Sequence, residues 1–315
     1  YIVSLRQGQQ AFQSVLSGIG NLYEHNLYMS NLFEYFALAA QSQRAATNGA
    51  SALPAANGAA LTSERAGLVF DDVGFRYPGK EAFALRHLDL RVAPADSLAI
   101  VGQNGAGKTT FVKLLARLYE PTEGRILLDG KDLKDWPEQE LRRRIGVVFQ
   151  DFNQYQLSLR ENVGVGSIEH QDDSERLERA LARGGADSVA STLPLGVDSP
   201  LGTWFEKGSE LSGGQWQKVA LARAFMREES DILVLDEPTA ALDAESEHAV
   251  FERFRQLSEG RTTIVISHRF PAVRMAQRII VLEQGRLVEQ GSHAELVRLG
   301  GKYAHMFALQ AAGYQ

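Results

Sequence analysis

The segment from Gly102 to Thr109 has the residue types and spacing of a phosphate-binding loop. It reads GQNGAGKT and matches the pattern G-x-x-x-x-G-K-[ST]. Glycines allow backbone N–H groups to turn inward and cradle phosphate oxygens, and a helix beginning at the loop adds the positive end of its dipole. Lys108 supplies a charge for β- and γ-phosphates, and the Thr109 hydroxyl can ligate Mg²⁺. The segment therefore predicts a site for phosphates and a magnesium ion.

Two adjacent acids, Asp236 and Glu237, directly follow the apolar run ILVL at residues 232–235. Such a run is typical of a strand covered on both faces, and its carboxyl end lies at the sheet edge where α/β folds bind ligands. We expect Asp236 to hold Mg²⁺ through water, and Glu237 to accept a proton from the attacking water or to orient it. Alone, the pair is equally compatible with a solvated acidic turn; the presence of a phosphate loop in the same chain favours catalysis.

The elements that must position these residues alternate between strand and helix patterns, which favours a largely parallel α/β core with a helical insertion. No internal repeat is present. We expect strands at 68–77, 83–92, 97–101, 125–128, 145–149, 232–235 and 262–266. We expect helices at about 108–118, 244–257, 270–276, 292–298 and 301–311, and a mostly helical stretch at 159–227.

Composition excludes several classes of protein. The chain has 315 residues, of which 44% are hydrophobic and 23% charged, values that are ordinary for globular proteins. Its formal charge of −6, from 33 basic and 39 acidic residues, disfavours nucleic-acid binding through bulk charge. Because it has no cysteine, a disulfide framework, a thiolate metal site and a cysteine nucleophile are excluded.

The N-terminal part of the chain differs from the rest. Residues 1–40 carry an apolar stripe at helical spacing, which one helix cannot bury alone. Residues 41–66 are rich in Ala, Ser, Gly and Asn and are predicted to be a flexible linker. No run of 18 or more mainly apolar residues is present, so we expect no complete transmembrane helix of the usual kind within the chain.

The segment Leu211–Gln215, LSGGQ, resembles the signature sequence of the ATP-binding cassette (ABC) ATPases. Other positions fit the same family, and the motifs occur in its order over about residues 68–311. Tyr77 is similar to the aromatic residue that stacks on adenine, and Gln150 to the Q-loop glutamine. Asp243 is similar to the D-loop aspartate, and His268 to the switch histidine.

This resemblance implies a P-loop NTPase core with a helical subdomain and an N-terminal β-subdomain, preceded by a helical segment. It implies an ATPase that uses ATP and Mg²⁺. Catalysis is expected from Lys108, Gln150, Glu237 and His268, with magnesium held by Thr109, Gln150 and Asp236. Nucleotide contacts are expected from Tyr77, Gly102, Gln103, Asn104, Gly105, Ala106, Gly107, Lys108, Thr109, Thr110, Ser212, Gly213, Gly214, Gln215 and Asp243.

In this family Ser212 and Gly214 would reach the γ-phosphate of ATP bound on a partner subunit. The resemblance therefore implies a head-to-tail pair of nucleotide-binding domains, homodimeric or heterodimeric, that buries two ATP molecules. Hydrolysis would let the pair separate.

The order of helical segment, linker and nucleotide-binding domain resembles an exporter-type half-transporter. We then expect residues 1–40 to end a transmembrane domain, 41–66 to be the linker, and 67–315 to be the ATP-binding domain, with its helical subdomain at about 151–227. The natural protein is expected to be longer at its N-terminus, to lie in the cell membrane with this domain on the cytoplasmic face, and to bind no nucleic acid. Lipid, peptide, drug and siderophore cargoes are all compatible with these residues.

Two alternatives remain open. A soluble ABC ATPase acting on nucleic acid or ribosomes is disfavoured by the acidic balance and the apolar segment at 1–40. A regulatory module without turnover is disfavoured by Glu237 and His268.

Two departures from the family pattern are the loop Thr203–Gly208, which in the family senses the membrane domain, and Trp216, where arginine is common. All catalytic positions are intact.

Overall fold

The computed structural model describes residues 66–204, 208–237, 260–267 and 269–312. The helix predicted at 1–40, and the linker predicted at 41–66 except for its last residue, therefore lie outside the described residues. So do Asp243, His268 and the helix predicted at 244–257. No helix within the described ranges combines the length and the apolar character that crossing a bilayer requires.

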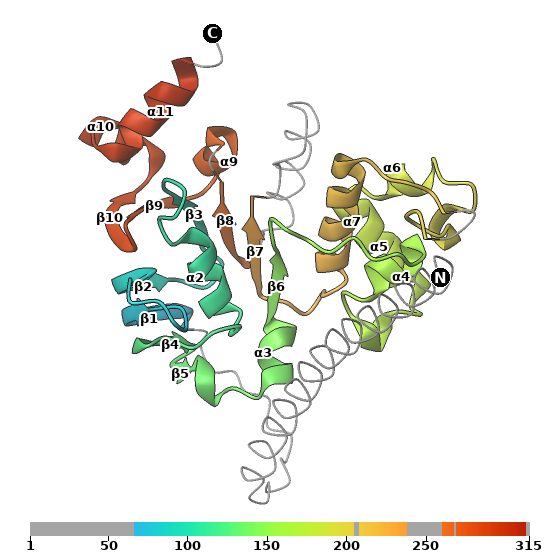
Figure 1. The fold of residues 1–315 in the computed structure, drawn as a ribbon, viewed down its shortest axis with the longest axis horizontal. Coiled ribbons are helices and arrows are strands. Elements are labelled where there is room, and N and C mark those ends of the chain that lie inside the picture. Colours follow the sequence, from blue (N-terminus) through green and yellow to red (C-terminus); the bar gives the residue numbers. More distant parts are fainter. Residues whose placement is uncertain (1–65, 205–207, 238–259, 268, 313–315) are drawn as a thin grey trace, which may run out of the picture. The chain divides into compact units, whose positions relative to one another are not determined.

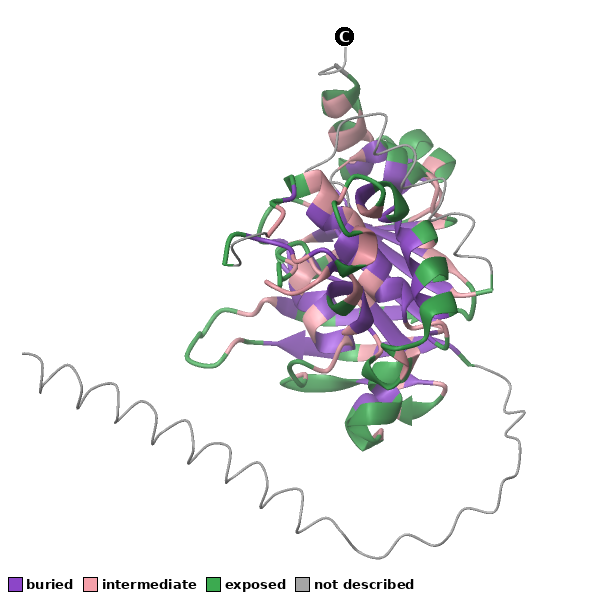
Figure 2. Ribbon diagram, turned by 90° about the vertical axis from the view of Figure 1, so that its right-hand side faces the viewer, coloured by how far each residue is buried: buried purple, intermediate pink, exposed green. Residues whose placement is uncertain are grey.

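A six-stranded sheet forms the centre of the described part, in the order β10-β9-β3-β8-β7-β6 (Figure 1). All neighbouring pairs are parallel except β9 and β10. Every residue of β7 and β8 is buried, as the apolar runs predicted, and Figure 2 shows buried residues concentrated along these central strands. The strands are β3 (Ser97–Val101), β6 (Ile145–Val148), β7 (Ile232–Asp236), β8 (Thr262–Ile266), β9 (Arg278–Glu283) and β10 (Arg286–Gly291).

A smaller antiparallel sheet, in the order β2-β1-β4-β5, packs against helix α2 (Lys108–Leu115). The rings of Phe70 on β1 and Phe111 on α2 stack with centroids 4.4 Å apart, so the two sheets share one hydrophobic core. The strands are β1 (Leu68–Phe75), β2 (Leu85–Val92), β4 (Glu123–Leu128) and β5 (Lys131–Asp132).

A helical layer with its own hydrophobic core covers the β6 side of the central sheet. Helix α5 ends at Gly184, where an added Cβ would lie 2.4 Å from the backbone nitrogen of Ala222 on α7, so these helices cross in close contact. The layer contains α4 (Leu159–Gly164), α5 (Ser174–Gly184), α6 (Asp187–Ala190) and α7 (Gly213–Phe225), with short 3-10 turns η2 (Ile168–His170) and η3 (Gly196–Asp198). Before β6 lie η1 (Leu133–Asp135) and α3 (Glu138–Arg144).

The C-terminal helices pack on the same face of the central sheet as the helical layer, over β3 and β9, around a third core that includes Val101 of β3, Ile279 of β9 and Tyr303. They are α9 (Phe270–Arg274), α10 (His293–Leu299) and α11 (Lys302–Ala312). The prediction of a largely parallel α/β core with a helical insertion is thus confirmed.

The hairpin of β9 and β10 was absent from the sequence prediction. Its apolar run IIVL at 279–282 is buried within the sheet. The turn residues Gln284 and Gly285 have φ of 48° and 78°. Positive φ at both positions is the backbone of a tight hairpin turn, but Gln-Gly lacks the Asn-Gly or Asp-Gly signal that marks such turns in a sequence.

Candidate functional site

The parallel strands bring the sequence motifs to one edge of the sheet. Ile266 of β8 pairs with Ile100 of β3 on one side and with Asp236 of β7 on the other. The carboxyl ends of these strands therefore meet. The phosphate loop follows β3 and Glu237 follows β7, and the chain after β8 leads through Ser267 to His268, which lies outside the described residues. This is the edge at which α/β sheets bind ligands.

The phosphate loop has a backbone that only glycine accommodates at its two ends. Gly102 has φ 157°, and an added Cβ would lie 2.3 Å from the carbonyl oxygen of Leu282. Gly107 has φ 104°, and a Cβ there would lie 2.7 Å from the carbonyl oxygen of Ala84. The loop then opens into α2, where the Phe111 N–H donates to the Gly107 carbonyl at 2.9 Å. Strand, glycine-rich loop and helix follow in the order that a phosphate-binding loop requires.

Lys108 is buried within this loop, with 8% of its surface exposed. Its Nζ donates to the carbonyl oxygens of Gly102 at 2.8 Å and Gln103 at 3.1 Å. Burial lowers the pKa of Lys108, while the carboxylates of Glu237 and Asp236 act to raise it. The ammonium group therefore lies within electrostatic reach of both acids and beside the loop that would carry phosphates.

Asp236 is a buried carboxylate, 1% exposed, and neither of its oxygens has a hydrogen-bond partner among the described residues. Burial raises the pKa of Asp236 to about 6, and the charge of Glu237 adds to the rise. The Thr109 hydroxyl lies close enough to favour the charged carboxylate and so to act against the rise in its pKa. The contact is too long or too bent to count as a hydrogen bond to either Asp236 oxygen. Two unpartnered carboxylate oxygens next to a hydroxyl are a donor set that suits Mg²⁺.

Glu237 is half-buried and has φ 53°, an uncommon backbone conformation for a residue with a side chain. Its N–H donates to the carbonyl oxygen of Ile266 at 2.9 Å, which ties it to the end of β8. The strain is held in place by the neighbouring strand, as is common where side chains must be aimed at a reaction centre.

Tyr77, which the resemblance predicts to stack on adenine, lies beside the phosphate-loop helix. Its hydroxyl is 3.1 Å from that of Thr110 on α2, and its ring makes edge contacts with Phe75 and Tyr119 at 4.9 and 5.3 Å between centroids. The ring is half-buried, so part of it is open to a ligand next to the loop.

The signature segment forms the start of helix α7. Ser212 is its N-cap and forms a capping box with Gln215, in which the Ser212 hydroxyl accepts from the Gln215 N–H and the Gln215 side chain accepts from the Ser212 N–H. Ser212 and Gly213 are exposed, whereas Trp216 is buried in the helical layer. Figure 1 shows α7 beyond β6 and β7 as seen from α2, so one chain holds its signature apart from its own phosphate loop.

Gln150 is exposed directly after β6, and Val148 of that strand pairs with Leu235 of β7. It therefore belongs to the same sheet edge as Asp236. The sequence analysis missed its neighbour Asp151, an exposed acid whose charge also raises the pKa of Asp236. Its position after a predicted strand end was the signal that could have identified it.

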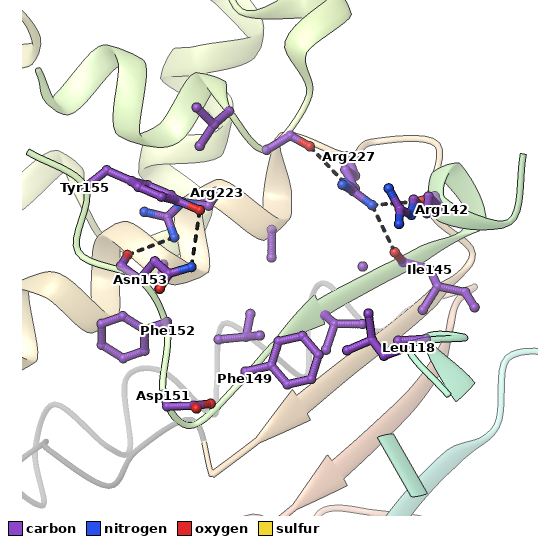
Figure 3. Close-up of a pocket in the computed structure, with 18 of the residues that line it drawn as sticks. Leu118, Arg142, Ile145, Phe149, Asp151, Phe152, Asn153, Tyr155, Arg223 and Arg227 are labelled. Carbon is purple, nitrogen blue, oxygen red and sulfur yellow. Dashed lines mark hydrogen bonds between the residues drawn. The ribbon is translucent and has the colours of Figure 1, made fainter. Parts of the chain in front are cut away.

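A groove of about 420 Å³ adjoins this segment and was also missed (Figure 3). Two half-buried arginines of the α7 region cross it. Arg223 donates to the Asn153 carbonyl at 3.1 Å, and Arg227 donates to the carbonyls of Arg142 and Ile145. The groove thus lies between β6 and the helical layer, with Asp151 and Phe152 at one end.

The remaining predicted contact residues lie in the phosphate loop and the signature. Gln103, Asn104 and Gly105 are exposed, Gly214 is half-buried, and Ala106 and Thr110 are buried. The exposed ones are accessible to a ligand, whereas the side chains of Ala106 and Thr110 are enclosed, and the Thr110 hydroxyl lies against that of Tyr77.

Comparison with known proteins shows that this chain is similar to transporters. Residues 85–240 match the family model described as ABC transporter. The chain is 37% identical over 306 residues to the subtilin transport ATP-binding protein SpaT of Bacillus subtilis, covering 97% of this chain and 48% of that protein. It is 45% identical over 260 residues to an ATP-dependent lipid A-core flippase of Cupriavidus metallidurans, covering 82% of this chain and 43% of that protein.

A solved structure described as a bacterial Atm1-family ABC exporter with ATP bound is also similar. It aligns with a TM-score of 0.73 and 38% sequence identity, over 83% of this chain and 44% of that chain. The chain therefore spans about half the length of the relatives it matches.

Proposed function

This chain belongs to the ABC transporter family, whose ATP-binding domain it carries, and we propose that it hydrolyses ATP to power export of a substrate across a membrane. The observation that carries this proposal is that Lys108, Asp236 and Glu237 lie at one edge of the sheet. Binding and cleaving a magnesium-bound triphosphate needs a cation for the phosphates, a carboxylate for the metal and an acid for the attacking water. Here these are the buried ammonium of Lys108, the unpartnered carboxylate of Asp236 and Glu237 in its strained backbone.

Nucleotide binding is assigned to the phosphate loop and Tyr77. Backbone N–H groups of the loop and the Lys108 ammonium would hold the phosphates, and the exposed part of the Tyr77 ring would stack on the base. Thr109, Gln150 and Asp236 would hold Mg²⁺, which when bound neutralises charge on the phosphate oxygens. Lys108 now donates to two loop carbonyls, and phosphate oxygens would take over as acceptors of the same ammonium.

Hydrolysis is assigned to Glu237, with His268 as its partner. The Glu237 N–H donates a hydrogen bond to Ile266 of β8, which fixes the backbone from which the Glu237 side chain extends. In this position it would orient the attacking water and accept its proton. We assign contact with the γ-phosphate to His268 from its place directly after β8 and Ser267 in the sequence.

The separation of the two motifs supports a second nucleotide-binding domain as a partner. The phosphate loop leads into α2, which packs in the core shared by the two sheets, and the signature begins α7 in the helical layer. Ser212, Gly213, Gly214 and Gln215, together with Asp243, would therefore act on nucleotide held by a partner subunit. The partner would place its own signature over the phosphate loop of this chain, in a two-fold, head-to-tail pair.

We place the domain at a membrane, on the side where ATP is available, which is the cytoplasmic face. The similar proteins named above are transporters, so a soluble ATPase acting on nucleic acid or ribosomes is not favoured. The transmembrane domain would be the second partner. Trp204, in the loop where this chain departs from the family pattern, is 82% exposed and is an accessible apolar contact for it.

The experiment that tests this function compares Glu237→Gln with wild type in ATP turnover and ATP binding. We expect the variant to bind ATP as tightly as wild type, because the side chain is not assigned to binding, and to lose turnover. The matched control is Glu120→Gln, an exposed acid after α2, which should hydrolyse ATP normally. An undiminished rate in Glu237→Gln would remove Glu237 from its assigned role, and no hydrolysis by the wild type would remove the function.

A further inference from the structure

Helix α11 is anchored to the central sheet at its N-terminal end. The Glu289 carboxylate on β10 accepts from the backbone N–H groups of Lys302 at 2.6 Å and Tyr303 at 3.0 Å. The Lys302 ammonium pairs in turn with Glu283 on β9. The first turn of the helix is thereby fixed to the hairpin whose residue Leu282 supports Gly102 of the phosphate loop.

The first two turns of α11 are also held by an aromatic cluster. Tyr303 is fully buried, and its hydroxyl lies 2.7 Å from Nδ1 of His293 on α10. Burial raises the pKa of Tyr303 to about 12, so its hydroxyl stays protonated. The rings of Tyr303 and Phe307 both contact Phe270, the first residue of α9, with centroids 5.4 and 5.1 Å apart.

The far end of α11 supplies a hydrogen bond that α9 lacks locally. A helix leaves its first backbone N–H groups without intrahelical partners. At α9 the N-cap is Arg269, whose side chain has only donors, and no side-chain cap is present. The N–H of Phe270 instead donates to Oε1 of Gln310 at 3.1 Å, across 40 positions of sequence. Gln310 therefore caps α9 from a different helix.

This cap acts on the segment that leads out of β8. On the near side of His268, Ile266 accepts from the Glu237 N–H at 2.9 Å. Beyond it, the Arg269 N–H donates to the Ser267 hydroxyl at 3.0 Å, and Phe270 is held by Gln310. Of these three hydrogen bonds, the first two join residues at the sheet edge. The third joins this segment to Gln310 on the separate helix α11.

We propose that Gln310 is a positioning residue for ATP hydrolysis, through which α11 fixes the backbone that follows His268. The proposal rests on the proposed function, because it assigns α11 a part in the same site. Nucleotide binding depends on the phosphate loop and does not involve this contact. Loss of the cap therefore slows turnover and leaves the KM for ATP unchanged.

The test compares three variants of the full 315-residue chain with wild type. Gln310→Ala removes the acceptor, Gln310→Glu keeps an oxygen that accepts from the Phe270 N–H, and Leu309→Ala is a control on the same helix at a side chain that is 63% exposed. The measurements are kcat and KM for ATP, and hydrogen exchange at the Phe270 amide.

We expect Gln310→Ala to lower kcat about fivefold with KM unchanged, and to speed exchange at Phe270. Fivefold is about 1 kcal/mol at 1.36 kcal/mol per tenfold, the size of one neutral hydrogen bond. Gln310→Glu should restore both values, and Leu309→Ala should match wild type.

Two results would overturn the inference while leaving the proposed function intact. One is an active wild type with an equally active Gln310→Ala; the other is a Gln310→Glu variant as slow as Gln310→Ala. A wild type without ATPase activity would overturn the proposed function, and this inference with it.

Discussion

Replacing Asp236 by asparagine should stabilise the nucleotide-free protein. The Asp236 carboxylate is buried with neither oxygen hydrogen-bonded among the described residues, so its charge is costly when no metal ion is bound, even with the Lys108 ammonium within electrostatic reach. Its pKa rises from the ordinary 3.8 to about 6. At 1.36 kcal/mol for each pKa unit, that rise corresponds to about 3 kcal/mol of lost stability at pH 7. Asparagine has nearly the same shape without the charge, so the variant should recover much of this free energy.

The pH dependence has a definite sign. The folded protein binds the Asp236 proton more tightly than the unfolded chain, so this group makes stability fall as the pH rises between about 4 and 6. The stability gained by Asp236→Asn should therefore be full at pH 7, smaller at pH 5, and absent below about pH 4.

The assay is urea unfolding in the presence of EDTA at pH 7 and pH 5, with saturating ATP and Mg²⁺ added in a second series. Asp135→Asn, at an exposed acid, is the control and should change stability by less than about 0.5 kcal/mol. With ATP and Mg²⁺ the order should reverse, because wild type gains stability from the bound ion and the variant gains less. A nucleotide-free Asp236→Asn protein less stable than wild type at pH 7 would refute the reasoning.

Three further predictions follow from the described contacts. Lys108→Ala should weaken ATP binding at least about tenfold in a fluorescent-nucleotide titration, since charge-assisted hydrogen bonds contribute about 1.5–3 kcal/mol; binding at wild-type strength would contradict the phosphate-loop assignment. Gly184→Ala should lower stability by about 1–3 kcal/mol in urea unfolding, because its Cβ would meet the Ala222 backbone at 2.4 Å, and an unchanged midpoint would show that α5 and α7 can separate freely. Trp204→Ala in the complete transporter in lipid should leave basal ATP hydrolysis unchanged and reduce its stimulation by cargo, and equal stimulation would exclude Trp204 from the contact with the membrane domain.

The parts of the site that depend on local backbone chemistry could be predicted from the sequence. The phosphate loop was recognisable because glycine spacing, a lysine and the start of a helix occur together within Gly102–Thr109. The position of Asp236 and Glu237 at the sheet edge followed from an apolar run that was long enough for a buried strand and ended in acids. Both signals lie within a few residues, where pattern and conformation are directly related.

Other features arise from contacts between distant segments and leave little trace in a local pattern. The hairpin of β9 and β10 depends on burial against β3, and its turn at Gln284 lacks a strong turn residue. The groove near Asp151 forms only where β6 meets the helical layer. The bond between Phe270 and Gln310 joins residues 40 positions apart, and glutamine has no special preference for that role.

The measurement that tests the central claim most directly is the oligomeric state of Glu237→Gln with ATP and Mg²⁺, determined by light scattering coupled to size exclusion. Because turnover is blocked and the signature lies apart from the phosphate loop of its own chain, we predict a dimer holding two ATP molecules that returns to monomers when ATP is removed. Substituting Ser212 by a bulky residue in the same background should prevent dimerisation without preventing ATP binding. Monomers that remain monomers with ATP fully bound would contradict the account.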